Sequence, residues 1–166
     1  PGNVFDVQRL RVEIKGLEVN LGIRVPIEGL RLWIGYADLE ARYDSNNPAD
    51  GVVDTDLDGV NISPDRLNLA ANYDRVPWAL RLQSQTYLSR SFVGRIRDPR
   101  NDFGGYTVVD FYGRYQTRFG GLSLSVQNLL NNQYIDFNSD TRLPTDNFAF
   151  FAGRGRTLTL GWGYRF

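Results

Sequence analysis

Three aspartates spaced two apart near the middle of the chain could do metal chemistry. Asp54, Asp56 and Asp58 stand in a D-x-D-x-D-G run that ends at Gly59, and Asp65 occupies the twelfth position of the pattern. Carboxylates at alternate positions before a glycine turn can wrap a hard cation such as Ca²⁺. A usual calcium loop has glutamate at its twelfth position and flanking helices, and this segment has neither. Residues 54–65 therefore allow a weak calcium site, and the alternative is an acidic, solvated loop.

Two long polar segments further along the chain combine arginine with aromatic side chains. Guanidinium groups pair with acidic oxygens, while aromatic rings cover the apolar parts of a ligand. Such a set suits an anionic, partly apolar chelate. For any single residue the alternative is packing within a loop or contact with lipopolysaccharide phosphates. The candidate ligand-binding residues are Arg90, Phe92, Arg95, Arg97, Tyr134, Phe137, Arg142 and Phe150.

The composition excludes several classes of active site. The 166 residues contain neither cysteine nor histidine, so thiol catalysis, thiolate or imidazole metal sites, disulfides and Ser-His-Asp triads are absent. We therefore predict no enzymatic activity and no cofactor other than the weak calcium candidate. A formal net charge of zero argues against a nucleic-acid partner. The chain begins at Pro1 without a recognisable signal peptide, which suggests a piece of a longer protein.

The last strand of the sequence is apolar on one side only. Between Thr157 and Phe166, large apolar residues alternate with small or polar ones, and the apolar set ends on Trp162, Tyr164 and Phe166. A strand has a period of two, so one face carries apolar side chains and the other carries small or polar ones. A soluble sandwich could use such a strand. An outer-membrane barrel fits better, with lipid outside, a hydrated lumen inside and an aromatic girdle at the interface.

The same alternation predicts about seven antiparallel strands in residues 7–25, 30–43, 66–73, 78–88, 106–117, 122–126 and 157–166. Short turns at 26–29, 74–77 and 118–121 alternate with long loops at 44–64, 91–105 and 131–153, as in outer-membrane barrels. The apolar phase of the first strand flips at Gly16, which predicts a β-bulge there. Bacterial single-chain barrels have an even number of strands, and seven strands would leave two unpaired edges. Further strands must therefore come from an absent N-terminal region of the same protein, from other copies or from a partner.

Charged residues are expected on the inner face of this wall. The lumen-facing set is Glu13, Glu18, Arg31, Arg66, Arg81, Asp110 and Arg114. These mixed charges either form pairs that hold a plug or make a hydrated surface with no specific role. Asp110 and Arg114 lack a neighbouring histidine or nucleophile arrangement, which argues against catalysis.

Several motifs together resemble one family. They are the runs 12–18 (VEIKGLE), 59–69 (GVNISPDRLNL), 106–110 (YTVVD), 126–134 (VQNLLNNQY) and 153–166 (GRGRTLTLGWGYRF). In this order and spacing they are similar to the barrel strands of TonB-dependent outer-membrane receptors, with closest likeness to the ferric-siderophore branch. The resemblance covers nearly the whole chain.

The resemblance implies that residues 1–166 are the C-terminal part of a barrel of about 22 strands, without its plug domain and preceding strands. It implies location in the bacterial outer membrane, contact with lipid and lipopolysaccharide, a ferric siderophore as ligand, and coupling to the TonB complex through an absent N-terminal region. Trp162, Tyr164 and Phe166 resemble the barrel-assembly signal. The alternative function is a stand-alone or oligomerising outer-membrane barrel or surface interaction protein without active transport.

Overall fold

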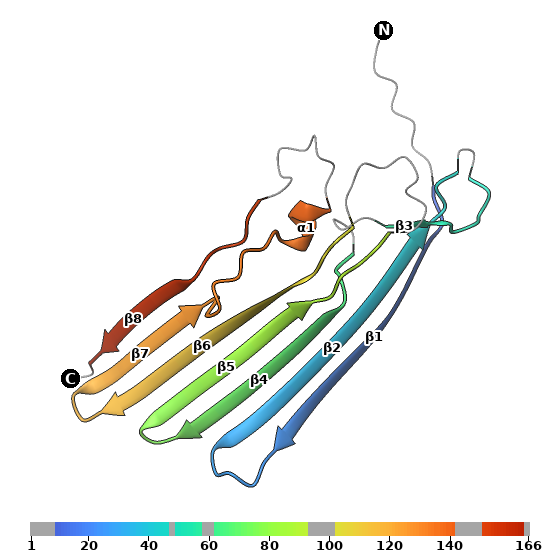
Figure 1. The fold of residues 1–166 in the computed structure, drawn as a ribbon. Coiled ribbons are helices and arrows are strands. Elements are labelled where there is room, and N and C mark those ends of the chain that lie inside the picture. Colours follow the sequence, from blue (N-terminus) through green and yellow to red (C-terminus); the bar gives the residue numbers. More distant parts are fainter. Residues whose placement is uncertain (1–8, 47–48, 58–61, 93–101, 142–150, 165–166) are drawn as a thin grey trace.

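The computed structural model describes residues 9–46, 49–57, 62–92, 102–141 and 151–164, which form one curved antiparallel sheet (Figure 1). Its elements are β1 (Val12–Arg24), β2 (Leu30–Tyr43), β3 (Thr55–Asp56), β4 (Arg66–Arg75), β5 (Trp78–Tyr87), β6 (Tyr106–Thr117), β7 (Gly120–Gln127), α1 (Phe137–Asp140) and β8 (Thr157–Gly163). Among the described residues, no helix has the length and apolar character needed to cross a membrane.

The seven long strands described here follow one another across the sheet in chain order, and the two-residue β3 pairs only with β2. Their short turns lie at one end, and their long connections, with β3 and α1, lie at the other (Figure 1). Gly29 supports the first turn with a φ of 84°, a conformation that glycine adopts without steric cost. The predicted all-β meander is confirmed. The sheet does not close on itself, and within the described chain β1 and β8 each pair on one side only.

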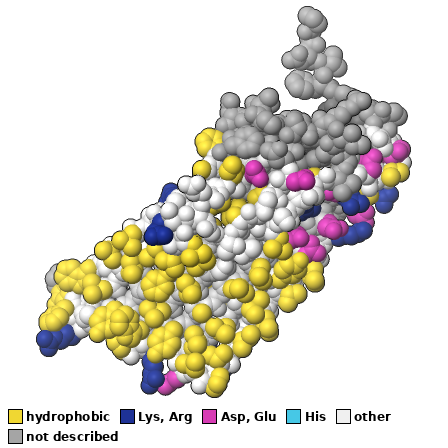
Figure 2. Space-filling model, in the orientation of Figure 1, with side chains coloured by type: hydrophobic (Ala, Val, Ile, Leu, Met, Phe, Trp, Pro, Cys, Tyr) yellow, Lys and Arg dark blue, Asp and Glu magenta, His cyan; other side chains and the backbone are white. Residues whose placement is uncertain are grey.

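The two faces of the sheet differ as alternation requires, because residues opposite each other in an antiparallel pair point to the same face. One face, called the outer face below, carries large apolar side chains in the open, with Leu160 73% and Trp162 68% exposed. Figure 2 shows hydrophobic side chains gathered over much of the visible face, with charged side chains mainly towards its ends. A soluble protein would cover so wide an apolar surface, whereas lipid covers it in a membrane barrel.

Three aromatic residues and one leucine form a row near the short-turn end of the outer face. Trp78, Tyr115, Leu122 and Trp162 are successive partners across β5, β6, β7 and β8. The rings of Trp78 and Tyr115 lie 4.4 Å apart between centroids. This row fits an aromatic girdle at the membrane–water interface.

The outer face changes character abruptly between Lys15 and Leu17 on β1. Lys15 forms an ion pair with Glu13 at 2.9 Å, whereas the outward positions from Leu17 to Ile23 are apolar. The register of β1 against β2 runs one to one through Gly16, so the predicted β-bulge is wrong. Glu13 shares the face of Lys15 and Leu17, so its predicted inward orientation is wrong as well. The outward side chains therefore change from charged to apolar at this level, while the alternation between the two faces continues unchanged.

The opposite, inner face carries the remaining predicted polar set. Glu18, Arg31, Arg66, Arg81, Asp110 and Arg114 occupy inner-face positions of the register. Near the long connections, the best-buried aromatic side chains are Phe103 and Phe137, which are 3% and 4% exposed. The sheet is therefore a wall with an apolar outside and a polar inside, and its compact packing lies beneath the loops.

Candidate functional site

A hollow of about 520 Å³ opens on the inner face where the long connections begin. Tyr87 ends β5, Tyr106 begins β6, and these two residues are register partners on the inner face. Their ring centroids lie 4.8 Å apart, and Tyr134 from the connection between β7 and β8 stacks on Tyr106 at 4.3 Å. The polar part of the lining also includes Asp136, Arg154, Asp110, Gln85, Gln127 and Asn128. We call Tyr87, Tyr106, Tyr134, Asp136 and Arg154 the tyrosine site.

Tyr134 is fixed by the strand-like contact between its loop and the segment before β8. Ile135 pairs with Ala152, and the backbone N–H of Gly153 donates to the carbonyl of Tyr134 at 2.7 Å. Any Cβ at Gly153 would run into the ring of Tyr134. A glycine is therefore needed at this position so that the ring can lie flat against the backbone.

The run from Asn128 to Asn132 anchors the loop that carries Tyr134. Asn128 has a φ of 49°, and its side-chain Nδ2 donates to the carbonyls of Asn132 at 2.9 Å and Arg154 at 3.0 Å. Asn128 is 3% exposed, so these bonds satisfy a buried amide. In this way one side chain holds both sides of the loop in place beside the tyrosine site.

Comparison with known proteins shows which family this sheet belongs to. The family model described as "TonB dependent receptor-like, beta-barrel" matches residues 3–129, which is more than half of the chain. The chain belongs to this receptor family. It is also 30% identical over 112 residues to the ferric aerobactin receptors of Escherichia coli and Klebsiella pneumoniae. Each match covers 63% of this chain and 14% of the relative, so the chain spans a small part of those receptors.

The described loop residues of the receptor bring four of the predicted ligand-binding residues into one region. Phe137 lies edge-on to Phe103 at 4.9 Å between ring centroids and near Phe92 at 6.3 Å, and Phe103 in turn meets Tyr106 at 5.9 Å. Phe137 is buried, so its ring packs beneath the other aromatic side chains of this cluster. Tyr134 is the member of the predicted set that lines the hollow.

Arg90 connects loops through its guanidinium group. Nη1 donates to the carbonyls of Leu39 at 2.8 Å and Ser63 at 3.3 Å, and the guanidinium lies 5.8 Å from the ring centroid of Phe92. These contacts give Arg90 a structural role at the loop end of the sheet. Its role in ligand binding stays a prediction. The other predicted residues, Arg95, Arg97, Arg142 and Phe150, lie outside the described residues.

Sequence reasoning missed Tyr87, Tyr106 and Arg154 as ligand candidates. Tyr87 and Tyr106 stand at the ends of strands, whereas the combination of arginine and aromatic residues that predicts ligand contacts lies in the loops. The alternation of faces along each strand could have identified them. Tyr87 lies on the same inner face as Arg81, and Tyr106 lies on the same inner face as Asp110. An inward tyrosine at the loop end of a strand is placed to meet a ligand that enters from the loops.

The aspartates of the calcium candidate have protein partners in the receptor. Asp56 pairs with Arg42 at 3.1 Å. The backbone N–H of Ser45 donates to Asp54, and this bond, with others from Ser45 and Thr55, lowers the pKa of Asp54. Asp58 lies outside the described residues, which hold no group of three His, Cys, Asp or Glu side chains placed for a metal ion. Calcium binding in 54–65 stays a prediction.

The last described strand presents its aromatic residues outwards. Trp162 lies on the outer face of β8, and its ring centroid is 6.5 Å from that of Tyr164. Both side chains are exposed, as a girdle or a recognition signal requires. Phe166 lies outside the described residues, and the assembly role of the three residues stays a prediction.

Proposed function

We propose that this chain is part of the barrel wall of a TonB-dependent receptor that takes up a ferric siderophore across the bacterial outer membrane. The observation that carries the proposal is the combination of a one-sided apolar wall with the family match to residues 3–129. The likeness to ferric aerobactin receptors supports a siderophore as the ligand class. A transport receptor needs no catalytic residues, so we also propose that the chain is not an enzyme.

The tyrosine site is the proposed contact with the chelate. Three tyrosine rings offer flat apolar surface and hydroxyl groups, and Arg154 offers a guanidinium group for acidic oxygens. The hollow faces inwards beneath the long connections, where a ligand captured by the loops would first meet the wall. Loop capture, loop closure and displacement of a plug domain by the TonB complex are the proposed steps of uptake. Lipid and lipopolysaccharide are the proposed partners of the outer face.

The test is binding of a panel of ferric hydroxamate, catecholate and carboxylate chelates to the intact receptor, read by quenching of protein fluorescence. We expect at least one chelate to bind. If no chelate quenches the fluorescence of a receptor that is correctly assembled in the outer membrane, the siderophore assignment fails.

A matched pair of variants locates the contact. Tyr134→Leu removes a ring that lines the tyrosine site, whereas Tyr36→Leu changes a tyrosine on the outer face of β2. We expect weaker chelate binding only for Tyr134→Leu, by about tenfold, because aromatic contacts contribute on the order of 1–1.5 kcal/mol. Equal effects of the two substitutions would remove the tyrosine site from the proposal.

A further inference from the structure

Gly113 leaves a gap between side chains on the outer face of β6. Its register partners on that face are Leu80 on β5 and Leu124 on β7. Apart from Gly120 at a turn, Gly113 is the only glycine at an outer-face position of the described strands. A hollow of about 510 Å³ lies over it, which we call the Gly113 hollow. Its outer-face lining includes Trp78, Leu80, Phe111, Tyr115, Leu160 and Trp162.

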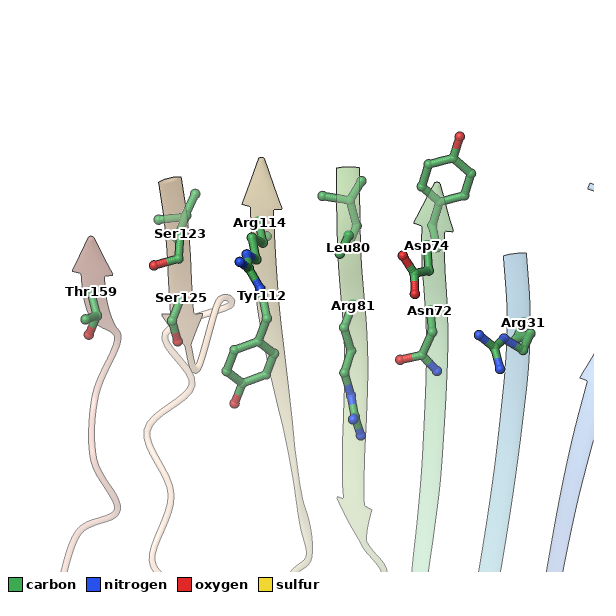
Figure 3. A pocket seen from close by; sticks show the side chains of 14 residues that line it. Arg31, Asn72, Asp74, Leu80, Arg81, Tyr112, Arg114, Ser123, Ser125 and Thr159 are labelled. Atoms are coloured by element: carbon green, nitrogen blue, oxygen red, sulfur yellow. The ribbon is translucent and has the colours of Figure 1, made fainter. Parts of the chain in front are cut away.

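The Gly113 hollow lies on the side of the wall that faces lipid in the proposed setting. Figure 3 shows inner-face side chains of the same strands, with Arg81, Tyr112 and Ser125 at about one level on β5, β6 and β7. These three strands are each paired on both sides within the described chain, so no further strand is needed to complete the walls beside Gly113. The occupant of the hollow must therefore come from the membrane.

The Gly113 hollow extends from the membrane interface into the apolar band. Tyr115 belongs to the row near the short turns, and Phe111 lies four residues deeper on β6, which is about 13 Å at the usual strand rise. One leaflet of the hydrocarbon core is about 15 Å deep. A Cβ added at Gly113 would lie 3.2 Å from the ring of Phe111, so this ring leans over the glycine. The hollow therefore has the direction and length expected for an acyl chain that starts at the interface.

Polar groups lie where the headgroup of such a lipid would be. A Cβ added at Gly120 would lie 3.0 Å from Nε1 of Trp162, which places this indole nitrogen beside the turn between β6 and β7. Arg118 stands in that turn, exposed, with its guanidinium group 4.5 Å from the ring centroid of Phe119. The ion pairs among the described residues involve other basic side chains. Figure 2 shows basic side chains beyond the hydrophobic area at this end of the face.

We propose that the Gly113 hollow binds one phospholipid molecule of the periplasmic leaflet, with an acyl chain along the hollow and the phosphate group at Arg118. A guanidinium group binds phosphate oxygens through charge-assisted hydrogen bonds, and the apolar lining removes the chain from its neighbours in the bilayer. The periplasmic leaflet follows from the short turns, which are periplasmic in outer-membrane barrels.

The inference rests on the proposed function for its setting, because this face meets lipid only if the wall spans the outer membrane. It goes beyond general contact with lipid. A flat apolar surface lets lipid molecules exchange freely, whereas a hollow beside a cationic side chain holds one molecule in a defined place.

The test is native mass spectrometry of the intact receptor released from outer membranes in a mild detergent, which counts the phospholipid molecules that each receptor retains. Gly113→Leu fills the hollow and should retain one phospholipid molecule fewer than the unmodified receptor. The matched control is Ala71→Leu, which adds a side chain on the outer face of β4, outside the hollow. This control should retain as many phospholipid molecules as the unmodified receptor.

A second pair of variants tests the headgroup contact. Phosphatidylglycerol is added back to delipidated receptor in the same detergent, and the bound fraction gives an apparent affinity. Arg118→Gln should weaken this affinity by about tenfold, because it removes a charge-assisted contact with phosphate. Arg24→Gln removes the same charge at the first short turn, outside the hollow, and should change the affinity by less than about twofold.

The heat-dependent shift in gel mobility shows which variants assemble. If Gly113→Leu does not assemble, Leu124→Trp fills the same space from β7 and takes its place. Unchanged phospholipid retention in the filled variant would overturn the inference, and so would an equal loss in Ala71→Leu. Loss of lipopolysaccharide or of receptor dimers, in place of a phospholipid, would assign the hollow to another occupant and overturn it too.

Ferric-chelate quenching measured on the same samples separates this inference from the proposed function. A receptor that loses a phospholipid only in the filled variant but binds no chelate removes the siderophore assignment and leaves the lipid site. Chelate binding with unchanged phospholipid retention in the filled variant removes only the lipid site.

Discussion

The backbone N–H of Asn128 donates to Oδ1 of Asp110 at 2.9 Å, which ties the start of the β7–β8 connection to the inner face of β6. Gln83 on β5 donates to the other oxygen of the same carboxylate at 3.1 Å. One carboxylate thus holds two strands and the loop that positions Tyr134. Asp110→Ala should destabilise the receptor by about 1.5–3 kcal/mol, since hydrogen bonds to charged groups contribute about that much. The measurement is the urea midpoint for unfolding from lipid vesicles.

The control for Asp110 is Glu40→Ala, which removes a carboxylate from an exposed outer-face position of β2. We expect its midpoint to stay close to that of the unmodified protein. A similar loss in both variants would show that general charge removal, and not the bond to Asn128, determines stability.

The two faces of β8 should respond differently to a new charge. Leu160 lies on the outer face and Thr159 on the inner face. Leu160→Arg should block assembly, because arginine facing lipid at mid-depth costs about 2–4 kcal/mol. Thr159→Arg should assemble far better, since the inner face is hydrated. Outer-membrane yield and the heat-dependent shift in gel mobility measure assembly, and equal damage from both substitutions contradicts the assignment of faces.

Gly153 and Gly155 provide a matched test of the tyrosine site. A Cβ at Gly153 would collide with the ring of Tyr134, whereas the nearest atom to a Cβ at Gly155 is Oδ1 of Asn131 at 3.6 Å. Gly153→Ala should therefore displace Tyr134 and weaken chelate binding by about tenfold, the equivalent of about 1.4 kcal/mol. Gly155→Ala should leave chelate binding unchanged. The comparison uses the same fluorescence titration, and loss of binding in both variants would argue against a specific role of Tyr134.

Two aspartates near the long connections should give opposite pH dependences. Burial raises the pKa of Asp65, and Asp38 nearby adds to this, although the N–H of Leu39 and the charge of Arg90 oppose it. Hydrogen bonds from Ser45 lower the pKa of Asp54. The contribution of Asp65 to stability is complete below its ordinary pKa and is lost as the pH rises through its raised value. The contribution of Asp54 is present above its ordinary pKa and is lost as the pH falls through its lowered value.

The measurement is limited proteolysis of these connections between about pH 3 and pH 7, a range that includes the ordinary aspartate pKa. Asp65→Asn should remove a component of protection that grows on acidification, and Asp54→Asn should remove one that shrinks. Proteolysis curves of the same shape for both variants would contradict the assigned directions.

Most of the fold could be predicted from the sequence, because a strand repeats every two residues and the faces of this wall differ strongly in polarity. The boundaries of β2 and β6 match the predicted segments 30–43 and 106–117. The β-bulge predicted at Gly16 is the part of the fold that the sequence pattern got wrong. The change in apolar phase there reflects the level at which β1 leaves the apolar band, and a sequence pattern alone cannot distinguish that level from a bulge.

The candidate site was harder to predict because its residues come together only through the register. Tyr87 and Tyr106 become neighbours because β5 and β6 pair at their loop ends. Phe137 is buried because α1 turns its ring towards Phe103, and its contact with a ligand stays a prediction. Residue type indicated the chemistry of these groups, and strand pairing determines which of them can act together.

The apolar stretch on the outer face of β1 has a consequence for the membrane that this receptor prefers. Leu17 to Ile23 is seven residues, or about 20 Å along the strand, and strand tilt shortens its height across a bilayer. Such a short hydrophobic length matches a thin bilayer, and the bacterial outer membrane is thinner than average. Vesicles of short-chain lipids should therefore accept the protein readily, whereas long acyl chains would have to compress around it.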